Sequence, residues 1–558
     1  MNRSPWPEAM DMPLPLCDLL LAGTVGREHL LRAAGMAGKA LAAACPADRA
    51  LWQRRRLSLL AAALEEDSLF GPTAVALLEA AGALPGSPPA LDPAFAALAA
   101  ETVRLFRVPD NTAYYQRLVT SGDTDRQRRY LENECHTGRH GLFWLHVALR
   151  QAVLDRNFDR GEALLKAALP PSLAGLGHKL AGDLALVSGR PALALARYEQ
   201  AHALAPWPSG LFRLGLAAWQ SGDRDLARRR LAAILAAMPE HVSAGLALYD
   251  MATGRDRATA RLPGSLAIAL YTYNKGRDLD LTLGSLFASD IGPARVVALD
   301  NAATDDTPDI LAGWRDRVGP GRLSVIRLPV NIGAPAARNW LAADPRVREA
   351  DFVAYLDDDV DLPADWLSRL AAAREAYPEA GVWGCRVADA QNPAIAQGVD
   401  TMPVPARQGD GEPMAWDFSD AHAEAFDAGA FAHMRPCLSV MGCCHLFRRE
   451  RLAQAGGFDI RYSPSQYDDV DHDLRLVLSG HPPVYQGHLA VGHRRPAPVF
   501  VPPRPDQLAG GQANRRKLLA KHRDRSEELA TGLREATLGD LTEKWRFLAE
   551  VGLLAQTS

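Results

Sequence analysis

The sequence predicts a multidomain α and α/β chain, in which a helical region precedes an α/β domain with a mostly parallel sheet and a helical tail follows. Three observations support this fold class. Residues 1–255 are rich in Ala and Leu and poor in β-branched residues, which favours helices. From residue 264 to about 500, short apolar runs alternate with helical patterns, which is typical of parallel strands joined by crossover helices. Residues 501–558 return to a charged, helical composition.

The overall composition is that of a globular protein and excludes some functions. The chain has 558 residues, of which 48% are hydrophobic and 23% are charged, and its net charge is −4. At ~150 residues per domain, this length corresponds to three or four units. A nucleic-acid-binding protein usually carries a strong basic excess, so the net charge argues against that class. The seven cysteines are odd in number and irregularly spaced, which fits neither a disulfide framework nor a zinc site.

The N-terminal segment and the hydropathy pattern predict where in the cell the protein is located. Met1 to Leu16 contains a single basic residue, Arg3, and the apolar run that follows is short and interrupted by Asp18, so we expect no signal peptide. No uninterrupted run of ~18 apolar residues occurs, so we expect no membrane span. These features predict a reducing, cytoplasmic location.

A repeat with a period of 33 residues occurs late in the helical region. Four positions recur at this interval, namely Gly182, Gly189, Ala194 and Pro206, which become Gly215, Gly222, Ala227 and Pro239. A weaker copy precedes them, around Ala148, Asn157 and Pro170. This order of helix, Gly-containing turn, helix and Pro resembles the tetratricopeptide repeat, which stacks into a concave, usually protein-binding surface. We therefore expect an N-terminal helical region over 1–139 and repeats over 140–255; an ordinary helical bundle is the alternative.

The α/β domain is expected over residues 264–500, after a polar boundary segment at 251–264. Buried apolar runs predict four strands and intervening amphipathic segments predict three helices, in the order strand 266–271, helix 278–288, strand 295–299, helix 307–317, strand 323–328, helix 334–343 and strand 352–356. Residues 401–436 lack periodicity and are expected to form a long loop. In the tail, helices are expected over 514–522 and 526–555.

Acidic residues follow two of the predicted strands. Asp300 ends the second strand, and Asp357, Asp358 and Asp359 follow the fourth. Ligands of open parallel sheets bind beyond the carboxyl ends of the strands. Paired carboxylates there can hold a hard divalent cation that in turn holds phosphates. The alternative is a turn residue at Asp300 and solvated acids ahead of the helix that starts near Pro363.

At this point the domain resembles a family 2 glycosyltransferase of the GT-A fold. Four blocks carry the resemblance: Tyr271-Thr-Tyr-Asn274, Val297-Ala-Leu-Asp300-Asn-Ala-Ala-Thr-Asp-Asp-Thr307, Asn331-Ile-Gly333 with Ala337-Arg338-Asn339, and Tyr355-Leu-Asp357-Asp358-Asp359. Any block alone would be weak evidence, but their order and spacing together are specific. The second block departs from the family at Ala303, where Ser is usual.

The resemblance implies a role for each matching residue. Asp300 would accept a hydrogen bond from the nucleotide base, Asp357 would contact the ribose or the metal, and Asp359 would bind the metal that bridges the diphosphate. Arg338 would contact the donor sugar or phosphate, unless it is a surface residue of its helix. The residues expected to bind the donor nucleotide-sugar are Tyr271, Asn274, Asp300, Arg338, Asp357 and Asp358.

A later segment supplies a candidate base. Gly456-Gly-Phe-Asp459 precedes Tyr467-Asp468-Asp469-Val-Asp471, which resembles the family's Glu-Asp block with Asp468 in the Glu position. Inverting transfer needs a carboxylate to remove the acceptor hydroxyl's proton, which contributes typically ~10²-fold or more. The catalytic candidates are therefore Asp468 and Asp469, with Asp468 slightly favoured, although one of them could instead cap the helix that begins near Val470.

A histidine completes the expected metal site. His493 follows the strand-like Leu489–Val491 and matches the histidine that many family members use as a further metal ligand. His488, five residues earlier, is the less favoured candidate. The expected metal ligands are thus Asp357, Asp359 and His493, and the expected cofactor is a divalent metal, Mn²⁺ or Mg²⁺.

Together these features predict an enzyme, a nucleotide-sugar-dependent glycosyltransferase of hexosyltransferase type. It would transfer a sugar with inversion to a hydroxyl of a glycan or a protein acceptor docked by the repeats. Asp300 suits uracil or thymine, which favours UDP or dTDP. A non-catalytic, protein-binding scaffold with a degenerate transferase domain is one alternative. A haloacid-dehalogenase-type phosphatase is another, because Asp357-Asp-Asp359 after an apolar strand resembles its nucleophile segment, but that segment lies on the first strand of its domain.

Overall fold

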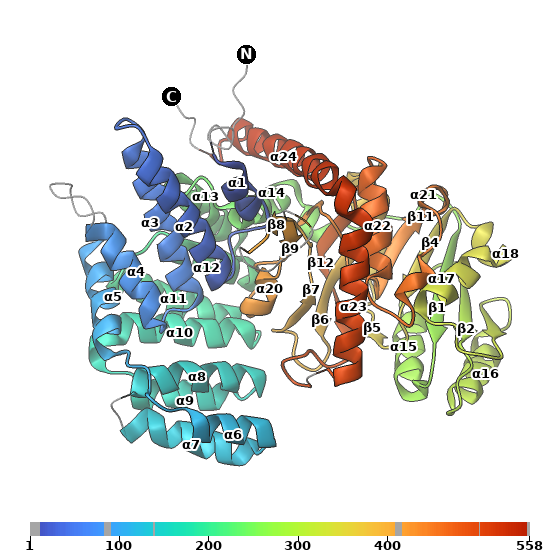
Figure 1. The fold of residues 1–558 in the computed structure, drawn as a ribbon, viewed down its shortest axis with the longest axis horizontal. Helices are drawn as coiled ribbons and strands as arrows, with labels where there is room; N and C mark the ends of the chain where they lie inside the picture. The colour runs from blue at the N-terminus through green and yellow to red at the C-terminus, as the bar shows by residue number, and fades with distance from the viewer. Residues whose placement is uncertain are drawn as a thin grey trace. The chain divides into compact units, whose positions relative to one another are not determined.

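The computed structural model describes residues 12–82, 91–137, 140–407, 414, 416–501 and 503–554. The chain forms two compact units, whose elements are labelled in Figure 1. The helical unit comprises residues 1–248, 424–430 and 545–558, and the α/β unit comprises residues 249–423 and 431–544. No helix in the described ranges combines the length and the apolar character that crossing a bilayer requires.

The first part of the chain is all helical, as predicted. Its elements are α1 (Leu14–Leu21), α2 (Arg27–Ala43), α3 (Arg49–Glu66), α4 (Gly71–Gly82), α5 (Pro93–Leu105), α6 (Ala113–Ser121), α7 (Thr124–Thr137), α8 (Gly141–Leu154), α9 (Phe158–Ala168), the 3-10 helix η1 (Pro171–Leu173), α10 (Ala174–Val187), α11 (Pro191–Leu204), α12 (Gly210–Ser221), α13 (Arg224–Ala237) and α14 (Val242–Thr253). The Gly- and Pro-rich sequence from Ala81 to Pro89 predicts a linker or long loop, most of which lies outside the described residues.

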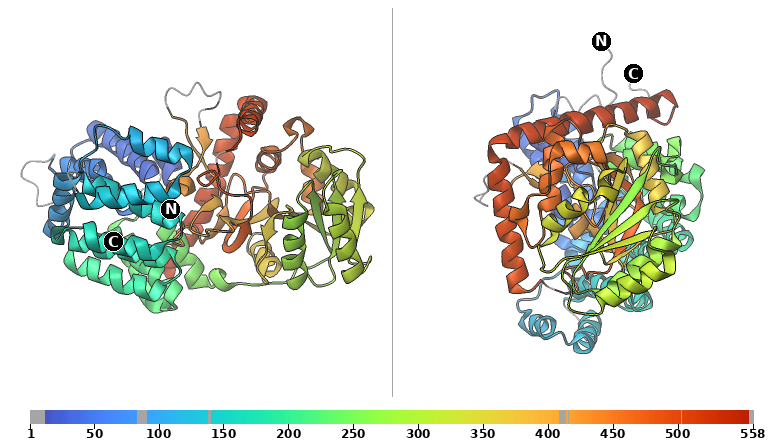
Figure 2. Two further views of the ribbon diagram at one scale, coloured as in Figure 1. Left: turned by 90° about the horizontal axis from the view of Figure 1, so that it is seen from below. Right: turned by 90° about the vertical axis from the view of Figure 1, so that its right-hand side faces the viewer.

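The 33-residue period has a physical basis in close helix packing. In α10, a Cβ added to Gly182 would lie 2.6 Å from the ring of Tyr198 on α11. One period later, in α12, a Cβ on Gly215 would lie 2.8 Å from Leu231 on α13. At both positions, therefore, two neighbouring helices approach so closely that only glycine fits between them. Successive helix pairs of this part of the chain can be followed in Figure 2.

The turns inside these pairs repeat as well. The turn glycines have positive φ angles of +74° and +92°, at Gly189 and Gly222. The small residues that follow are fully buried in both copies, at Ala194 and Ala227. A helix followed by a glycine in the left-handed region and a second helix is thus present twice in the same phase. The assignment of these pairs to the tetratricopeptide class stays a prediction.

The C-terminal segment that begins at Trp545 belongs to the helical unit. Trp545 is 2% exposed and packs over Gly245 of α14, where a Cβ would clash with the indole. An aromatic ring of this size contributes a large buried apolar area. The helical unit therefore depends on a residue almost 300 positions later in the sequence.

All the strands in the described ranges belong to the α/β unit. They are β1 (Leu266–Thr272), β2 (Arg295–Asp300), β3 (Leu323–Arg327), β4 (Phe352–Leu356), β5 (Val360–Asp361), β6 (Val382–Asp389), β7 (Ala396–Gly398), β8 (Pro403–Pro405), β9 (Trp416–Phe418), β10 (Met434–Pro436), β11 (Cys444–Arg448) and β12 (Val484–His493). Its helical elements are η2 (Arg255–Arg257), α15 (Gly276–Ala288), α16 (Thr307–Val318), α17 (Ala334–Ala343), α18 (Pro345–Arg348), α19 (Trp366–Ala376), α20 (Ala421–Glu424), α21 (Arg449–Ala455), η3 (Ile460–Tyr462), α22 (Asp468–Leu478), α23 (Pro505–His522), η4 (Arg523–Arg525) and α24 (Ser526–Glu550).

The main sheet confirms the predicted parallel strands. Its strand order is β10-β12-β6-β11-β4-β1-β2-β3, and β1 pairs in parallel with both β2 and β4. Thr272 lies opposite Asp300, and Leu270 lies opposite Leu356. The carboxyl ends of β2, β1 and β4 therefore meet at one edge of the sheet, with apolar side chains of these strands buried against the flanking helices.

The second half of the sheet is mixed and differs from the expectation of a long loop at 401–436. β11 runs antiparallel to β4 and β6, whereas β12 is parallel to β6. Within 401–436, β8 pairs with β9, and β10 joins the edge of the main sheet against β12. Strands of three residues are too short to show a periodicity, which explains the error; residues 408–413 and 415 lie outside the described part.

The tail and the cysteines follow the predictions with small shifts. The first tail helix begins at Pro505, nine residues before the expected start, because Pro at the first helical position suits a helix N-terminus. The second helix begins at Ser526, as expected, and ends at Glu550. All seven cysteines are free thiols.

Candidate active site

The candidate active site is a cavity of about 330 Å³ within the α/β unit. It lies at the carboxyl ends of β1 and β4 and is bounded by α17, α22 and the end of β12. Its lining is strongly charged, with five carboxylates and four basic side chains: Asp357, Asp358, Asp359, Asp468, Asp469, Lys275, Arg338, His493 and Arg495. Acids predicted from two distant segments thus share one cavity.

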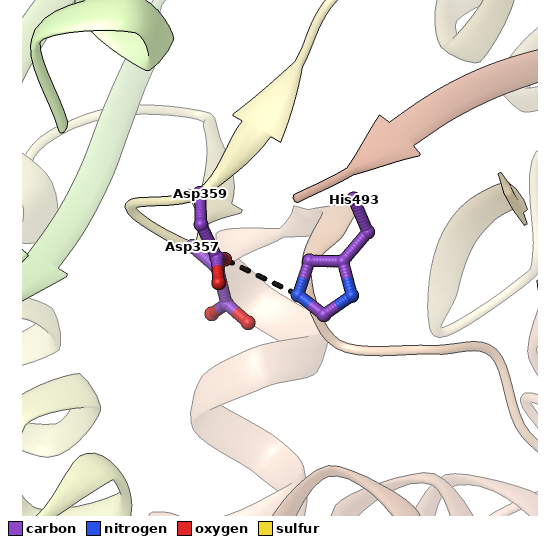
Figure 3. A group of neighbouring side chains, drawn as sticks. All are labelled: Asp357, Asp359 and His493. Atoms are coloured by element: carbon purple, nitrogen blue, oxygen red, sulfur yellow. Dashed lines mark ion pairs between the residues drawn. The ribbon is translucent and has the colours of Figure 1, made fainter. Parts of the chain in front are cut away.

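Three of the predicted residues form a group suited to a metal ion. One ligand atom from each of Asp357, Asp359 and His493 lies within 4.8 Å of the others (Figure 3). His493 Nε2 is 3.2 Å from Asp359 Oδ1. Strand pairing explains the encounter, because His493 at the end of β12 lies opposite Val360, directly after the acidic run. Two carboxylates and an imidazole are a donor set that fits Mn²⁺ and related divalent cations.

A second layer of contacts orients the histidine. His493 Nδ1 lies 2.8 Å from Gln397 Oε1, and an amide oxygen only accepts hydrogen bonds, so Nδ1 carries the proton. Nε2 is therefore the nitrogen that faces the carboxylates. Gln397 is itself held in this orientation because its amide nitrogen donates to the backbone oxygen of Arg495 at 2.8 Å. Such partners fix the tautomer and direction of a metal-binding histidine.

The turn that carries the acids is held by a buried hydroxyl. Thr282 of α15 is fully buried, and its Oγ1 donates to the backbone oxygens of Asp358 and Val360 at 3.0 Å. It also accepts from the backbone N–H of Val360 at 3.0 Å. The backbone N–H of Asp357 donates to the carbonyl of Cys443 at 2.9 Å. Hydrogen bonds to Thr282 of α15 and to the carbonyl of Cys443 thus hold the backbone of the acidic run in place.

Burial and neighbouring cations set the protonation of the acidic run. Burial raises the pKa of Asp358 to about 6, although Lys275 opposes the shift. Burial also raises the pKa of Asp357, against the lowering effect of Arg338. For Asp359, burial alone would raise the pKa, but the hydrogen bond and charge of His493 together with Lys275 hold it well below its usual range. Asp359 is therefore the most firmly ionised of the three.

Lys275 is a site residue that the sequence analysis missed. Its Nζ lies 2.5 Å from Asp359 Oδ2 and 3.3 Å from Asp358 Oδ1. It follows Asn274, whose φ of +53° turns the chain out of β1, and it immediately precedes α15. A lysine directly after the first strand-end block was the available signal. Arg495, two positions after His493, also lines the cavity and was missed in the same way.

Arg338 connects the two acidic groups of the site. It is 4% exposed, so it is not a surface residue of α17. Its Nη1 lies 2.5 Å from Asp468 Oδ2, and its Nη2 lies 3.5 Å from Asp357 Oδ1. Tyr271, whose hydroxyl donates to Asp357 Oδ1 at 3.1 Å, has its ring 5.4 Å from the same guanidinium. One buried cation therefore bridges a predicted metal ligand and a predicted base.

The two candidate bases have different surroundings. Asp468 is 2% exposed and paired with Arg338. Asp469 is half-buried, and its Oδ2 accepts from the backbone N–H of Gly442 at 3.0 Å. Burial raises the pKa of Asp468, while Arg338 acts in the opposite direction. Both residues lie in the first turn of α22, so the helix begins two residues before the predicted start.

Two predicted donor-binding residues are not part of the cavity wall in the described structure. Asp300 is 1% exposed; its Oδ1 accepts from Ala303 N at 2.7 Å, and Arg327 Nε lies 3.3 Å from its Oδ2. Asn274 Oδ1 accepts from Thr304 N at 2.7 Å. Both side chains thus hold the loop after β2, whose Asn301 does line the cavity. Asp300 holds this turn through Oδ1 alone.

His488 lies away from the metal-binding group. Its Nε2 is 2.8 Å from Asp250 Oδ2, and the same carboxylate oxygen accepts from the backbone N–H of Met434 at 2.7 Å. This buried network holds β10 to the end of α14. The lower rank given to His488 as a metal ligand agrees with this placement.

Comparison with known proteins identifies the class. The model of the family described as "Glycosyl transferase family 2" matches residues 267–454. Two curated proteins, each an N-acetylglucosaminyl-diphospho-decaprenol L-rhamnosyltransferase from a strain of Mycobacterium tuberculosis, are 27% identical over 242 residues, which cover 41% of this chain and 76% of theirs. The chain is a glycosyltransferase. The segment similar to glycosyl transferase family 2 lies within its α/β unit.

Solved structures give more distant likenesses. A mannosyltransferase from Pyrobaculum calidifontis, in complex with GDP-Man and Mn²⁺, is 19% identical with a TM-score of 0.34, over 58% of this chain and 88% of its own. TarS of S. aureus in complex with UDP is 18% identical with a TM-score of 0.30, over 41% of this chain and 59% of its own.

Proposed function

We propose that the α/β unit transfers a sugar, with inversion, from a nucleoside-diphosphate sugar to a hydroxyl group, and that the reaction depends on a divalent metal. One observation carries the proposal. Two carboxylates and a histidine converge on one side of the cavity, at Asp357, Asp359 and His493, while a second carboxylate pair, Asp468 and Asp469, lines the same cavity. A donor site and a base within one cavity are what a single displacement at an anomeric carbon requires.

The donor's diphosphate would be held by positive charge on one side of the cavity. Mn²⁺ or Mg²⁺ bound by Asp357, Asp359 and His493 would neutralise the charge that grows on the departing nucleoside diphosphate. Lys275 and Arg495 line the same cavity and add two further cations. Because Lys275 holds Asp359 through Oδ2, it leaves Oδ1 facing His493 and the metal position. Lys275 therefore also directs a ligand atom.

For the nucleotide, we propose a uracil or thymine base. The support is Asp300 at the end of β2, where a carboxylate can accept from the imide N–H that these bases carry. Its Oδ2 is buried and accepts no hydrogen bond among the described residues, apart from the ion pair with Arg327. The curated mycobacterial relatives are named as rhamnosyltransferases, so a deoxyhexose donor is included in the proposal.

For the base, the contacts favour Asp469 over Asp468. Burial raises the pKa of Asp468, but its carboxylate is held by Arg338 at 2.5 Å and is almost inaccessible to an acceptor hydroxyl. Asp469 is more accessible, and its carboxylate contacts backbone N–H groups, Oδ2 with Gly442 at 3.0 Å and Oδ1 with Val470 at 2.9 Å. In the proposed step, the acceptor oxygen bonds to the anomeric carbon, its proton passes to Asp469, and the carbon–oxygen bond to the diphosphate breaks.

The acceptor is proposed to be a glycan or a protein. The helical unit supports a protein acceptor, since paired helices present a surface of the kind that binds polypeptides. The phosphatase alternative loses support from the topology, because Asp357 follows β4, a central strand that three strands precede in the chain.

A thermal-shift screen tests the proposal. The full-length protein is heated with UDP, dTDP or GDP, each with and without Mn²⁺. A ligand at 100 times its Kd stabilises the folded state by about 2.7 kcal/mol, so a bound nucleotide produces a clear rise in Tm. We expect stabilisation that needs both nucleotide and metal and that Asp359→Asn removes. Stabilisation by none of the nucleotides, together with release of phosphate from a phosphomonoester, would reverse the assignment.

A further inference from the structure

Helix α23 packs against the turn that leads into the two candidate bases. This turn, residues 463–467, joins η3 to α22, and Pro464, Ser465 and Gln466 within it line the active-site cavity. Figure 1 shows α23 beside α22, and all of these elements belong to the α/β unit. The segment similar to glycosyl transferase family 2 ends at residue 454, so α23 lies beyond it. A helix outside that segment therefore supports one wall of the active site.

The 463–467 turn has a backbone conformation that needs support. Gln466 and Tyr467 have φ angles of +77° and +69°, in the left-handed region that residues with a Cβ rarely adopt. Such residues persist only where surrounding contacts hold them, and they are common at functional sites. Asp468 and Asp469 follow directly, so the backbone of the turn sets where the two carboxylates enter the cavity.

Asn514 of α23 supplies several of these contacts with one side chain. It is 3% exposed, and its Nδ2 donates to the backbone oxygen of Tyr462 at 2.8 Å. The same nitrogen lies 3.0 Å from the backbone oxygen of Ser465 and 3.3 Å from that of Gln466. The direction of the amide is fixed, because Lys517 Nζ, which only donates, lies 3.0 Å from Oδ1. Asn514 therefore ties the residue before the turn to two residues within it.

Two further contacts hold the turn between α17 and α23. The backbone oxygen of Pro464 accepts from the N–H of Ala334 at 2.8 Å, in the first turn of α17. On the other side, a Cβ added to Gly511 of α23 would lie 2.5 Å from Gln466 Oε1, so the helix backbone lies close to the side chains of the turn. The turn is thus fixed from both sides by helices of the α/β unit.

The last turn of α23 holds α22 itself. Asp471, which is fully buried in the first turn of α22, accepts from Lys521 Nζ through Oδ2 at 2.9 Å. Its Oδ1 lies 2.8 Å from His522 Nε2. Asp471 lies three residues after Asp468 and two after Asp469, so α23 anchors α22 at the turn of helix that carries both candidate bases.

We propose that Asn514 is a positioning residue for sugar transfer. By holding the 463–467 turn, it places the carboxylate of Asp469 where it accepts the proton of the acceptor hydroxyl. The inference rests on the proposed function of the α/β unit and on Asp469 as its base. Asn514 is not among the described residues that line the cavity, so it acts through the turn and touches no substrate. Helix α23, expected from the sequence only as part of a helical tail, then completes the active site.

Hydrogen exchange of the full-length protein, followed by mass spectrometry, tests the placement of Asp469 without any substrate. The reporter is the backbone N–H of Gly442, which donates to Asp469 Oδ2 at 3.0 Å. Asn514→Ala should speed exchange at Gly442 by about tenfold, because the loss of a hydrogen bond to a charged group has an effect of this size. Asp469→Ala removes the acceptor itself and should give the same change. Gln512→Ala, at an exposed position of α23, is the control and should leave the exchange unaltered.

Steady-state kinetics test the consequence for transfer. UDP-glucose, dTDP-rhamnose and GDP-mannose are each supplied with Mn²⁺, and release of the nucleoside diphosphate is measured well below the Tm of each variant. Asn514→Ala should lower kcat by up to about 10²-fold, the cost of a misplacement of about 1 Å, while the donor KM stays unchanged. Because Asn514 acts through Asp469, adding Asn514→Ala to Asp469→Asn should cause no further loss.

A loss of stability alone would give a different pattern. If Asn514→Ala does not fold, Lys517→Met replaces it, because loss of the donor to Oδ1 frees the amide and should give the same changes at smaller size. Unaltered exchange at Gly442, additive losses in the double variant, or equal kcat in Asn514→Ala and Gln512→Ala would overturn the proposal. Turnover of none of the donors by the unchanged protein would count against the transferase function, and the exchange result would still decide whether Asn514 places Asp469.

Discussion

The two cavities of this protein use charge in opposite ways. In the α/β unit, five carboxylates line a space of about 330 Å³, and three of them are consecutive in the sequence. In the helical unit, a cleft of about 420 Å³ is lined by five carboxylates, four Lys or Arg side chains and a histidine, and most of these charges lie in ion pairs. Like charges held together by a rigid scaffold need a cation, whereas paired charges are already satisfied. The comparison separates a cavity in which consecutive carboxylates converge from a cleft in which most charges are already paired.

The largest expected effect comes from removing one charge at the metal-binding group. Asp359→Asn should lower sugar transfer by about 10³-fold or more, because several kcal/mol of charge stabilisation are lost and each 1.36 kcal/mol is a factor of ten. Transfer is measured with radiolabelled donor sugar and Mn²⁺. Asp365→Asn is the control, since Asp365 pairs with Arg369 at 2.5 Å outside the cavity. Equal activity of the two variants would remove the reason for a metal site here.

The second prediction separates the two neighbouring acids. Asp469→Asn should lower kcat by ~10²-fold or more while donor binding and Tm stay close to normal, since a general base contributes that much. Asp468→Asn should instead lower the stability of the fold by about 3 kcal/mol or more, because Arg338 loses its shortest ion pair and stays buried with the longer contact to Asp357. Urea unfolding and steady-state kinetics measure both quantities. The reverse pattern would assign the base to Asp468.

A third prediction concerns the contact that orients His493. Gln397→Leu removes the acceptor of the Nδ1 proton and should weaken Mn²⁺ binding about 10-fold to 100-fold. Competition between Mn²⁺ and a metal-binding dye measures this affinity without any donor. Gln454→Leu, on exposed α21, should leave it unchanged. If Gln397→Leu binds Mn²⁺ normally, His493 is not a ligand oriented by Gln397.

The smallest expected effect lies in the helical unit. Gly215→Ala places a methyl group 2.8 Å from Leu231 and should lower stability by about 1–3 kcal/mol, the usual result of overpacking. Gly35→Ala, in α2 with no atom within 4 Å of the new methyl, should raise stability by about 0.5–1 kcal/mol. Calorimetry of the full chain measures both. Equal effects at the two positions would mean that the 33-residue period has no packing basis.

The parts of the site that the sequence could predict are those with local signals. Asp357 and Asp359 directly follow a buried apolar run, so their place at a strand end was readable. His493 ends another apolar run. The order of sequence blocks in the family was enough to predict that it lies beside the acids. The four parallel strands were readable for the same reason, since each is a short buried run between turns.

The remainder depends on contacts between residues far apart in the sequence. Arg338 and Asp468 are 130 positions apart, and no local pattern distinguishes a buried bridging arginine from one on a helix surface. Gln397 reaches His493 from β7, a three-residue strand too short to show a period. The short strands within 401–436 were missed for that reason too.

The route of the chain has a practical consequence for anyone who wishes to divide this protein. The backbone passes between the two units at four places, and residues 424–430 and 545–558 belong to the helical unit. A fragment ending near residue 250 would lack the indole of Trp545 that covers Gly245 and the carboxylate of Glu424 at α2. Newly exposed apolar surface of this kind promotes aggregation. Limited proteolysis should therefore give nicked protein whose pieces stay together, rather than two separable halves.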